Sequence, residues 1–460
     1  MTLIKSISGI RGTIGGEPGN ALTPVDMVKF AGAYSTWIKK RTNSTERTKV
    51  VIGRDARISG DMVNRIITGT LAASGVDVVD LGFATTPTVE MAVVGLKADG
   101  GIILTASHNP KQWNALKLLN EKGEFLNNAD GEELLAMADK SDFTFAEIND
   151  IGSVTHDNTY LDKHIEAVLN LPLVDIDSIY KANFKVVVDA VNSVGGTAVP
   201  RLLAALGVHA VELNCTPNGE FSHNPEPLPE HLTEIAKMVP EKEADLGIVV
   251  DPDVDRLALI CENGSFFGEE YTLVAVADYI LSNKKGNTVS NLSSSRALKD
   301  VTEQHGGEYY SSAVGEVNVV AEMKRVNAVI GGEGNGGVIY PELHYGRDAL
   351  VGIALFLSLL AQKKISCSQL RAQYPYYHVS KNKVVLTPET DINGILDKIK
   401  EQYSAYRISD IDGVRVDFDK ERKWVHLRKS NTEPIIRIYA EASSQKEADE
   451  LAKQIMNNLK

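Results

Sequence analysis

One pattern recurs three times along most of this 460-residue chain and limits its fold more than any other feature. A short apolar run is followed by a polar loop, an amphipathic helical pattern that ends at a glycine, and a second apolar run. The three units begin at Val50, Lys185 and Thr288. Strand–helix–strand units of this kind form largely parallel or mixed sheets with helices on their faces.

Each unit is followed by one more apolar strand that runs into an unusual loop. The loops are Thr105–Pro110, Asp251–Arg256 and Gly331–Gly337. Parallel α/β sheets bind ligands at the carboxyl ends of their strands. Three equivalent loops therefore predict that three similar domains line one central cleft.

The chain after about Tyr374 has a different pattern. A strand, a helix, a hairpin and a closing helix predict a compact α+β module. We therefore predict an α/β protein of four domains, with three repeated mixed α/β/α sandwich domains and a C-terminal α+β domain around a central cleft. The predicted boundaries are residues 1–151, 152–265, 266–373 and 374–460.

The composition excludes several classes of protein. Lys and Arg number 48 against 61 Asp and Glu, a net charge of −13 that argues against a nucleic-acid binder. The three cysteines lie far apart, with neither a disulfide nor a zinc pattern. The longest apolar run, Leu350–Ala361, is too short to span a membrane and predicts a buried helix. The N-terminal residues also lack a signal-peptide pattern, so we expect a cytoplasmic protein without a membrane partner. We further expect it to be a monomer or a homodimer.

The first loop places Ser107 and His108 between a strand and an expected helix start. Ser107 could carry a nucleophile or a transferred phosphoryl group near exposed backbone amides. The alternative is structural: a serine that caps the helix in a turn closed by Pro110.

The second loop carries Asp251, Asp253 and Asp255, two residues apart at the end of an apolar strand. Converging carboxylates of this kind form a hard oxygen site suited to Mg²⁺. The alternative is a solvated surface loop. A calcium EF-hand is excluded because Arg256 occupies the position that requires glycine.

The third loop, Gly332–Gly337, formally matches a dinucleotide-binding fingerprint. No clear ribose-binding acid follows about twenty residues on, so a nicotinamide enzyme is a weak alternative. Glu333 inside the loop is better suited to hydrogen-bond sugar hydroxyls, and a plain tight turn is the structural alternative.

A fourth polar cluster runs from Arg428 to Pro434, just after a strand. An arginine, two hydroxyls and an asparagine can hold a phosphate through charge-assisted bonds and backbone amides. A basic hairpin turn is the alternative.

The four loops occur once each, in this order, one in each predicted domain. In this arrangement the chain resembles the α-D-phosphohexomutase family over essentially its whole length. The resemblance implies that Ser107 is the phosphoserine, and that Asp251, Asp253 and Asp255 hold Mg²⁺ together with a phosphoserine oxygen. The other matching positions are Arg11 and Lys117 near the transferring phosphate, Arg256 after the metal loop, Glu333 and Asn335 at the sugar hydroxyls, and Arg428, Ser430, Asn431 and Thr432 at the second phosphate.

The family reaction interconverts the 1-phosphate and 6-phosphate of a hexose or hexosamine through a bisphosphorylated sugar, which also primes the enzyme. Details of the third and fourth loops resemble most the members called phosphoglucosamine mutases, which convert glucosamine 6-phosphate to glucosamine 1-phosphate. Phosphomannomutase or phosphoglucomutase activity is the alternative, and a non-catalytic sugar-phosphate sensor is a more remote one.

The chain departs from the family at one position. Many bacterial members carry a histidine, sometimes assigned as the general base, where this chain has Gly337. His108, His344 and Lys117 are the candidates to replace it, and His108 is included among the expected catalytic residues.

Overall fold

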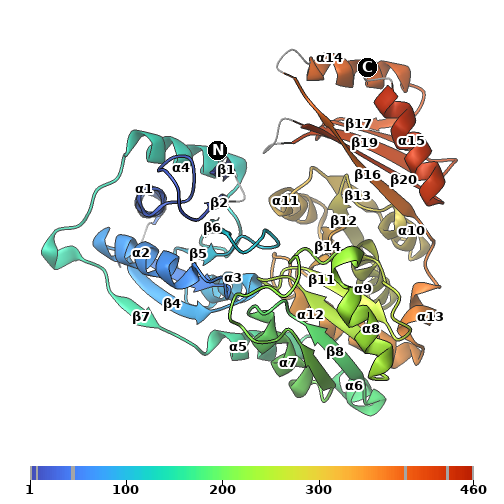
Figure 1. Ribbon diagram of the computed structural model, residues 1–460, viewed down its shortest axis with the longest axis horizontal. Helices are drawn as coiled ribbons and strands as arrows, with labels where there is room; N and C mark the ends of the chain where they lie inside the picture. Colours follow the sequence, from blue (N-terminus) through green and yellow to red (C-terminus); the bar gives the residue numbers. More distant parts are fainter. Residues whose placement is uncertain (1–2, 7–8, 43–46, 388–390, 431–434, 458–460) are drawn as a thin grey trace.

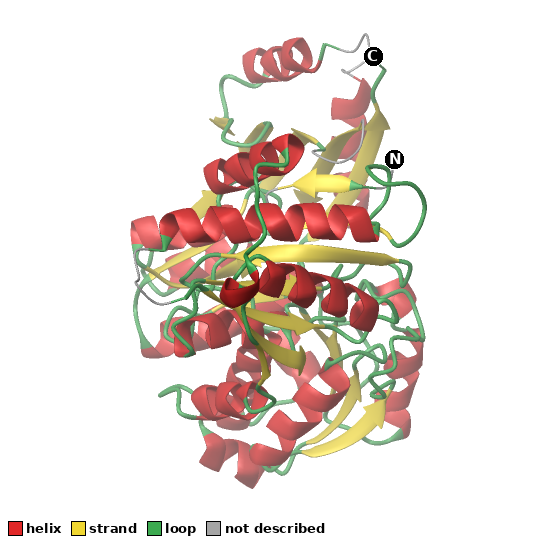
Figure 2. Cartoon of the chain, turned by 90° about the vertical axis from the view of Figure 1, so that its left-hand side faces the viewer, coloured by secondary structure: helices red, strands yellow, loops and turns green. Residues whose placement is uncertain are grey.

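The computed structural model describes residues 3–6, 9–42, 47–387, 391–430 and 435–457 (Figure 1). In this part of the chain four β-sheets follow one another along the sequence, and helices pack against them (Figures 1 and 2). Three sheets are mixed and the fourth is antiparallel. The predicted architecture of three α/β/α domains and a C-terminal α+β domain is therefore confirmed.

The first three sheets share one arrangement of four strands, to which the first sheet adds β1 (Ile4–Ser6), β2 (Gly9–Thr13) and β7 (Val154–His156). In each, the first strand pairs in parallel with the second and the third, and the third pairs antiparallel with the fourth. In chain order the strands are β3 (Lys49–Arg54), β4 (Asp77–Phe83), β5 (Gly100–Leu104) and β6 (Trp113–Leu119), then β8 (Lys185–Asp189), β9 (His209–Leu213), β10 (Leu246–Val250) and β11 (Leu257–Cys261), then β12 (Asn287–Asn291), β13 (Tyr309–Ser312), β14 (Ala328–Glu333) and β15 (Gly337–Ile339).

The helices repeat in the same way. One helix follows the first strand, one follows the second, and one follows the fourth. In that order they are α2 (Gly60–Ala73), α3 (Thr86–Gly95) and α4 (Asn128–Lys140), then α7 (Gly195–Ala205), α8 (Thr233–Glu241) and α9 (Glu269–Asn283), then α10 (Ala297–Gln304), α11 (Glu316–Val326) and α12 (Ala349–Lys363). The remaining helices of this region are α1 (Pro24–Arg41), α5 (Tyr160–Leu169), α6 (Ile176–Ala182) and α13 (Cys367–Arg371).

The amino-acid pattern explains this repeat. The central strands β3, β8 and β10 are rich in Val and Ile and buried along most of their length, as expected for strands covered by helices on both faces. The glycines that follow α2, α7 and α10 adopt positive φ angles of 74°, 72° and 68° at Gly75, Gly207 and Gly306. This left-handed conformation ends a helix and is nearly free of strain only for glycine.

The predicted buried helix at Leu350–Ala361 is confirmed as α12. Every residue from Ala349 to Ala361 is buried. Asp348 caps the helix, because its Oδ1 accepts a hydrogen bond of 2.8 Å from the backbone N–H of Leu350. None of the described helices is long and apolar enough to cross a membrane.

The helix start expected after the serine is wrong, because residues 113–119 form strand β6. β6 is buried between β5 on one side and β2 (Gly9–Thr13) on the other, with Leu104 opposite Leu116. The hydrogen bonds of a strand with two partners outweigh the local helix-start pattern at Pro110. An outer strand, β1 (Ile4–Ser6), extends the first sheet beyond β2.

The predicted domain boundaries stay predictions, but the first sheet extends beyond residue 151. A short edge strand, β7 (Val154–His156), pairs in parallel with β4. Its three residues are exposed. A strand so short and so exposed has no hydrophobic pattern from which it could be predicted.

The fourth sheet is an antiparallel sheet of five strands in the order β16-β20-β19-β18-β17. Its core includes Ile399 and Ile455 from two helices that pack on one face. The elements are β16 (His378–Val385), α14 (Ile392–Gln402), β17 (Arg407–Ser409), β18 (Val414–Phe418), β19 (Lys423–Lys429), β20 (Ile435–Ala442) and α15 (Gln445–Asn457).

Candidate active site

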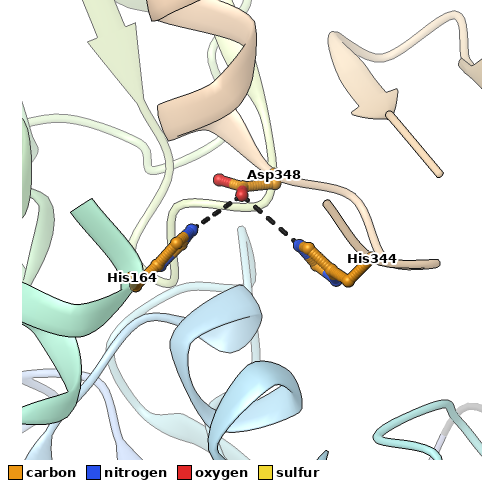
Figure 3. Close-up of side chains that lie close together, drawn as sticks. All are labelled: His164, His344 and Asp348. Carbon is orange, nitrogen blue, oxygen red and sulfur yellow. Dashed lines mark hydrogen bonds and ion pairs between the residues drawn. The ribbon is translucent and has the colours of Figure 1, made fainter. Parts of the chain in front are cut away.

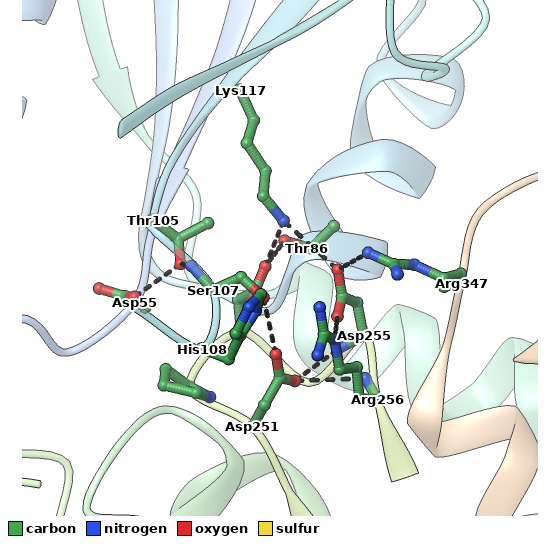
Figure 4. Close-up of polar contacts among 12 residues, drawn as sticks. Asp55, Thr86, Thr105, Ser107, His108, Lys117, Asp251, Asp255, Arg256 and Arg347 are labelled. Carbon is green, nitrogen blue, oxygen red and sulfur yellow. Dashed lines mark hydrogen bonds and ion pairs between the residues drawn. The ribbon is translucent and has the colours of Figure 1, made fainter. Parts of the chain in front are cut away.

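Three loops meet where the first three sheets end. Each connects the third strand of its sheet to the antiparallel fourth strand. We name them the serine loop (residues 105–112), the aspartate loop (residues 251–256) and the glycine–glutamate loop (residues 331–337, which include the end of β14 and the first residue of β15). Figure 4 shows side chains from the first two loops pointing toward one another. The fold thus brings together the carboxyl ends of β5, β10 and β14, as the repeat predicts.

Ser107 lies at the centre of this site. It is 6% exposed, and its hydroxyl donates a hydrogen bond of 2.9 Å to Oδ2 of Asp251 (Figure 4). Its φ of 48° is left-handed, a conformation that is uncommon for serine. The capping alternative is wrong, because the serine loop leads into a strand rather than a helix.

Asp251, Asp253 and Asp255 are fully buried, so the surface-loop alternative is wrong. Their carboxylates lie within 4.8 Å of one another, an arrangement that could hold a metal ion. Oδ1 of Asp253 and Oδ1 of Asp255 have no hydrogen-bond partner among the described residues. Buried carboxylate oxygens without a partner are costly, and an oxygen-seeking divalent cation would satisfy them.

The charges around the triad are strongly coupled. Burial, and then the charges of Asp255 and Asp253, hold the pKa of Asp251 well above its ordinary value. Burial would raise the pKa of Asp255 as well, but the cations of Arg347, Lys117 and Arg256 outweigh it and lower that pKa. The site therefore keeps negative charge only because buried cations balance it.

Lys117 supplies one of these cations. Its Nζ lies 2.6 Å from Oδ2 of Asp253 and 3.3 Å from Oδ2 of Asp255. Burial alone would lower the pKa of Lys117, but the two carboxylates raise it well above the ordinary value. Thr86, at the start of α3, donates a further hydrogen bond of 2.5 Å to Asp253.

Arg11 contacts the serine loop, whereas His108 and Arg256 lie within the serine loop and the aspartate loop. Nη1 of Arg11 donates to Oδ1 of Asn109 at 3.5 Å, and Nδ1 of His108 lies 3.3 Å from Oγ of Ser107. Burial, and then the charge of Arg256, hold the pKa of His108 well below its usual range. Nε of Arg256 is buried without a hydrogen-bond partner in the described part of the chain. That nitrogen keeps a donor for an anionic ligand.

Arg347 links the aspartate loop to the glycine–glutamate loop. Its guanidinium donates hydrogen bonds of 2.6 Å to Asp255, 2.7 Å to Glu333 and 3.0 Å to Glu316. Glu333 is the last residue of β14 rather than part of a loop, and Asn335 lies beside it at 3.4 Å. The nicotinamide alternative is wrong, because strand β15 follows this loop where the fingerprint requires a helix.

The fourth cluster lies apart from these loops. Arg428 is inside strand β19 rather than after it, and its side chain pairs with Asp412 at 3.0 Å. In the described part of the chain this ion pair, not a contact with the serine or aspartate loop, holds Arg428. Ser430 is buried, whereas Asn431 and Thr432 lie outside the described residues.

The C-terminal domain docks on the third domain through several polar contacts. Arg415 donates a hydrogen bond of 2.5 Å to the carbonyl of Leu292, and the backbone N–H of Arg296 donates to Glu441 at 3.0 Å. Asp412, the partner of Arg428, also accepts a hydrogen bond of 3.0 Å from the backbone N–H of Val314. These contacts connect the fourth cluster to the third domain.

A buried cluster outside the loops joins the first three domains. Nε2 of His164 and Nε2 of His344 lie 2.8 Å and 3.3 Å from Oδ2 of Asp348 (Figure 3). Nδ1 of His344 lies 3.3 Å from Glu90 of α3. Although burial opposes it, hydrogen bonds from the ring to Asp348 and Glu90 raise the pKa of His344 to about 10. Both ring nitrogens of His344 are thus engaged by carboxylates.

The sequence reasoning missed several of these residues. Arg57 and Arg347 contact the functional loops, and Glu90 and Asp348 both contact His344, yet none of the four was singled out. Arg57 pairs with Asp55, two residues before it, but no local pattern indicates that pair. The others pair with residues far away in the sequence, and neither periodicity nor spacing indicates such pairs.

Models of known protein families match this chain domain by domain. Family models described as phosphoglucomutase/phosphomannomutase, alpha/beta/alpha domains I, II and III, match residues 3–145, 162–264 and 268–377. The model described as phosphoglucomutase/phosphomannomutase, C-terminal domain, matches residues 383–458.

Individual relatives match over nearly the whole chain. A phosphoglucomutase/phosphomannomutase of Thermococcus kodakarensis is 36% identical over 96% of this chain and 95% of its own length. A probable phosphoglucosamine mutase of Methanopyrus kandleri is 33% identical over 98% of this chain and 96% of its own length. The crystal structure of a phosphoglucomutase/phosphomannomutase family protein from Burkholderia thailandensis has a TM-score of 0.83 and 26% identity, and covers 99% of this chain and 98% of that chain.

The fold, the loops and these matches define an isomerase that moves a phosphoryl group within phosphorylated sugars. The chain belongs to the α-D-phosphohexomutase family. Because its matches are to enzymes over the full length, the alternative of a non-catalytic sensor is not supported.

Proposed function

We propose that this phosphohexomutase is a phosphoglucosamine mutase that interconverts glucosamine 6-phosphate and glucosamine 1-phosphate. The observation that carries the proposal is the hydrogen bond of 2.9 Å between Ser107 and the buried aspartate triad. It pairs a hydroxyl that could carry phosphate with a site suited to a cation. The full-length similarity to a probable phosphoglucosamine mutase supports the choice of sugar.

In this proposal Ser107 carries the phosphoryl group between turnovers. The P–O bond to Ser107 breaks, a P–O bond to a sugar hydroxyl forms, and the hydroxyl proton leaves for a nearby base. The bisphosphosugar then turns, and its other phosphoryl group returns to Ser107. A bisphosphorylated hexose or hexosamine could therefore also prime an unphosphorylated enzyme.

The aspartates would hold Mg²⁺ together with an oxygen of phosphorylated Ser107. When bound, Mg²⁺ neutralises charge on the phosphoryl group during transfer. Lys117, Arg11 and Arg256 add positive charge from the surrounding walls. Phosphoryl transfer needs such positioned positive charge more than covalent chemistry from the protein.

His108 is the best supported of the candidate bases. Its Nδ1 lies 3.3 Å from Oγ of Ser107. By contrast, Lys117 is held by two carboxylates, and His344 lies between Glu90 and Asp348. A base must reach the proton it accepts, and geometry is the first criterion.

Sugar recognition is assigned to Glu333 and Asn335, and recognition of the second phosphate to Arg428, Ser430, Asn431 and Thr432. Nη1 of Arg428 is bonded to Asp412, so a phosphate held by the fourth cluster would use the other N–H groups of Arg428 or replace Asp412. The cytoplasmic location and the monomeric or dimeric state remain predictions.

A substrate panel tests the choice of sugar. We expect the highest kcat/KM with glucosamine 6-phosphate, measured beside glucose 6-phosphate and mannose 6-phosphate in assays that detect each 1-phosphate. Phosphoglucomutase or phosphomannomutase activity is the second candidate, because the Thermococcus kodakarensis relative carries that name at 36% identity. A preference for glucose or mannose phosphate would contradict the proposal and support the second candidate.

Arg428→Ala should raise KM and lower kcat, because a sugar whose second phosphate is loosely held becomes misaligned. Loss of a charge-assisted contact of ~1.5–3 kcal/mol corresponds to roughly 10- to 150-fold in kcat/KM. Mg²⁺ affinity should not change. Steady-state kinetics and a magnesium titration measure both effects.

Lys423→Ala is the control, since this residue lies at the opposite end of the same strand. An unchanged kcat/KM in Arg428→Ala would remove Arg428 from the substrate site. A loss explained by weaker Mg²⁺ binding would do the same.

A further inference from the structure

Arg57 is a buried arginine with no donor left for a ligand. It lies between β3 and α2 and is 1% exposed. Its Nε donates a hydrogen bond of 3.0 Å to Asp55. Its other four N–H groups donate to backbone carbonyls of the serine loop and the start of β6: Ser107 at 2.5 Å, Asn109 at 2.6 Å, Pro110 at 2.8 Å and Trp113 at 2.9 Å.

A guanidinium has five N–H donors, and here all five are used within the protein. Arg57 is therefore unlike Arg256, whose buried Nε has no hydrogen-bond partner among the described residues and lies 3.9 Å from Oδ1 of Asp255. Arg256 can bind an anion in its present arrangement, whereas Arg57 can do so only by releasing the serine loop. The contacts of Arg57 therefore indicate that it holds the serine loop in its conformation.

Thr105 holds the same loop from the amide side. Its hydroxyl donates a hydrogen bond of 2.7 Å to Asp55 and accepts one of 2.9 Å from the backbone N–H of Ser107 (Figure 4). Asp55 thereby joins Arg57 and Thr105 in one buried network. Both the N–H and the carbonyl of Ser107 are fixed by it, at the residue whose φ of 48° is unfavourable for a serine.

The segment that contains Arg57 also reaches the aspartate loop. The backbone N–H of Ala56 donates a hydrogen bond of 3.4 Å to the hydroxyl of Ser193, which donates one of 2.7 Å to the carbonyl of Pro252. Residues 55–57 thus contact the serine loop directly and the aspartate loop through Ser193. The distance between these two loops depends on this segment.

We propose that Asp55, Arg57 and Thr105 are positioning residues for phosphoryl transfer, which hold Ser107 in its left-handed conformation with Oγ directed at Asp251. The inference rests on the proposed function of Ser107. In the step concerned, a P–O bond to the sugar breaks, a P–O bond to Oγ of Ser107 forms, and the serine proton passes to the sugar oxygen. None of the three residues forms or breaks a bond.

A positioning role predicts which kinetic constant changes. Thr105 is fully buried, so its side chain cannot touch the sugar. Misplacing a nucleophile slows the chemical step, whereas substrate binding depends on other residues. Loss of the Thr105 hydroxyl should therefore lower kcat and the rate of Ser107 phosphorylation while leaving KM nearly unchanged.

The test compares Thr105→Val, which removes both hydrogen bonds, with Thr105→Ser, which keeps them. Glucose 1,6-bisphosphate is added to dephosphorylated enzyme, and intact-protein mass follows phosphorylation over a single turnover. We expect Ser107 to be phosphorylated roughly 10- to 100-fold more slowly in Thr105→Val than in the wild type. The steady-state KM for the sugar phosphate should stay within about threefold of the wild-type value. Thr105→Ser should stay close to the wild-type rate.

Thr70→Val is the matched control. Thr70 is a buried threonine of the same domain, whose hydroxyl donates only to the carbonyl of Ile66 in its own helix. This variant should keep the wild-type phosphorylation rate. Melting temperatures of all variants separate slow chemistry from loss of folded protein.

Several results would overturn the proposal: wild-type phosphorylation in Thr105→Val, an equal loss in Thr105→Ser, or a loss confined to KM. If Thr105→Val does not fold, Arg57→Lys, which keeps the charge but not the five-fold contact, decides by the same criteria. A wild-type enzyme that takes no phosphate on Ser107 would contradict the proposed function instead.

Discussion

Ser107→Ala should reduce turnover on the order of 10⁴-fold or more, as expected when a covalent nucleophile is removed. The substitution deletes one oxygen atom that is 6% exposed, and alanine can take the same backbone conformation at a cost similar to that for serine. Loss of the hydrogen bond to Asp251 should lower the free energy of unfolding by about 1–3 kcal/mol. The fold should therefore survive while activity does not.

Intact-protein mass and steady-state kinetics measure this effect. Wild-type enzyme should gain one phosphoryl group from a bisphosphosugar, and Ser107→Ala should gain none. Ser35→Ala is the control, because Ser35 is a buried serine of the same domain whose hydroxyl donates only to Gly32 within α1. A fully active Ser107→Ala variant, with no phosphate on the wild type under any priming condition, would refute the assignment.

Local sequence pattern was enough to predict the repeat and the loops that form the candidate site. Apolar strands, helix-ending glycines and the polar residues after each third strand are local signals, and each is visible within about a dozen residues. The strand after the serine loop shows where this fails. Residues 113–119 are a strand because β2 and β5 pair with them from both sides, and local sequence does not contain those partners.

The ion pairs between the buried carboxylates and cations of the candidate site could not be predicted, because the paired residues lie far apart in the chain. Arg347 is 92 residues from Asp255 in the sequence, and Lys117 is 136 residues from Asp253. Side chains at such separations meet only after three domains have folded and docked. Sequence spacing therefore indicates which loops carry charge, but not which cations neutralise them.

The ion pairs of Arg347 allow three carboxylates to be buried close together. Asp255 and Glu333 are buried and would repel each other and Glu316 without a cation between them. Arg347 supplies that cation with hydrogen bonds to all three carboxylates. Breaking a buried ion pair leaves an uncompensated charge, which typically costs ~3–5 kcal/mol. The aspartate loop and the glycine–glutamate loop are thus held together by one guanidinium.

Removal of divalent cations should abolish activity, and Asp253→Asn should weaken Mg²⁺ binding by at least about tenfold, because the affinity of a hard-cation site depends on its number of anionic ligands. Asp253 suits this test because its two oxygens have separate surroundings. Oδ2 is held by Lys117 and Thr86, whereas Oδ1 has no hydrogen-bond partner in the described part of the chain. We therefore expect Oδ1 to be the oxygen that binds the cation.

Isothermal titration with Mg²⁺ reports the affinity directly, without reference to turnover, and activity after chelation and gel filtration reports the requirement. Asp189→Asn is the matched control: Asp189 is also buried at the end of a strand in the same domain, but its carboxylate accepts hydrogen bonds from Val191 and His223. Its substitution should leave Mg²⁺ affinity unchanged. If chelated enzyme keeps its full rate, or if both variants bind Mg²⁺ like the wild type, the aspartate loop is structural. Lys117 and Arg347 would then balance the carboxylates of Asp253 and Asp255 without a metal ion.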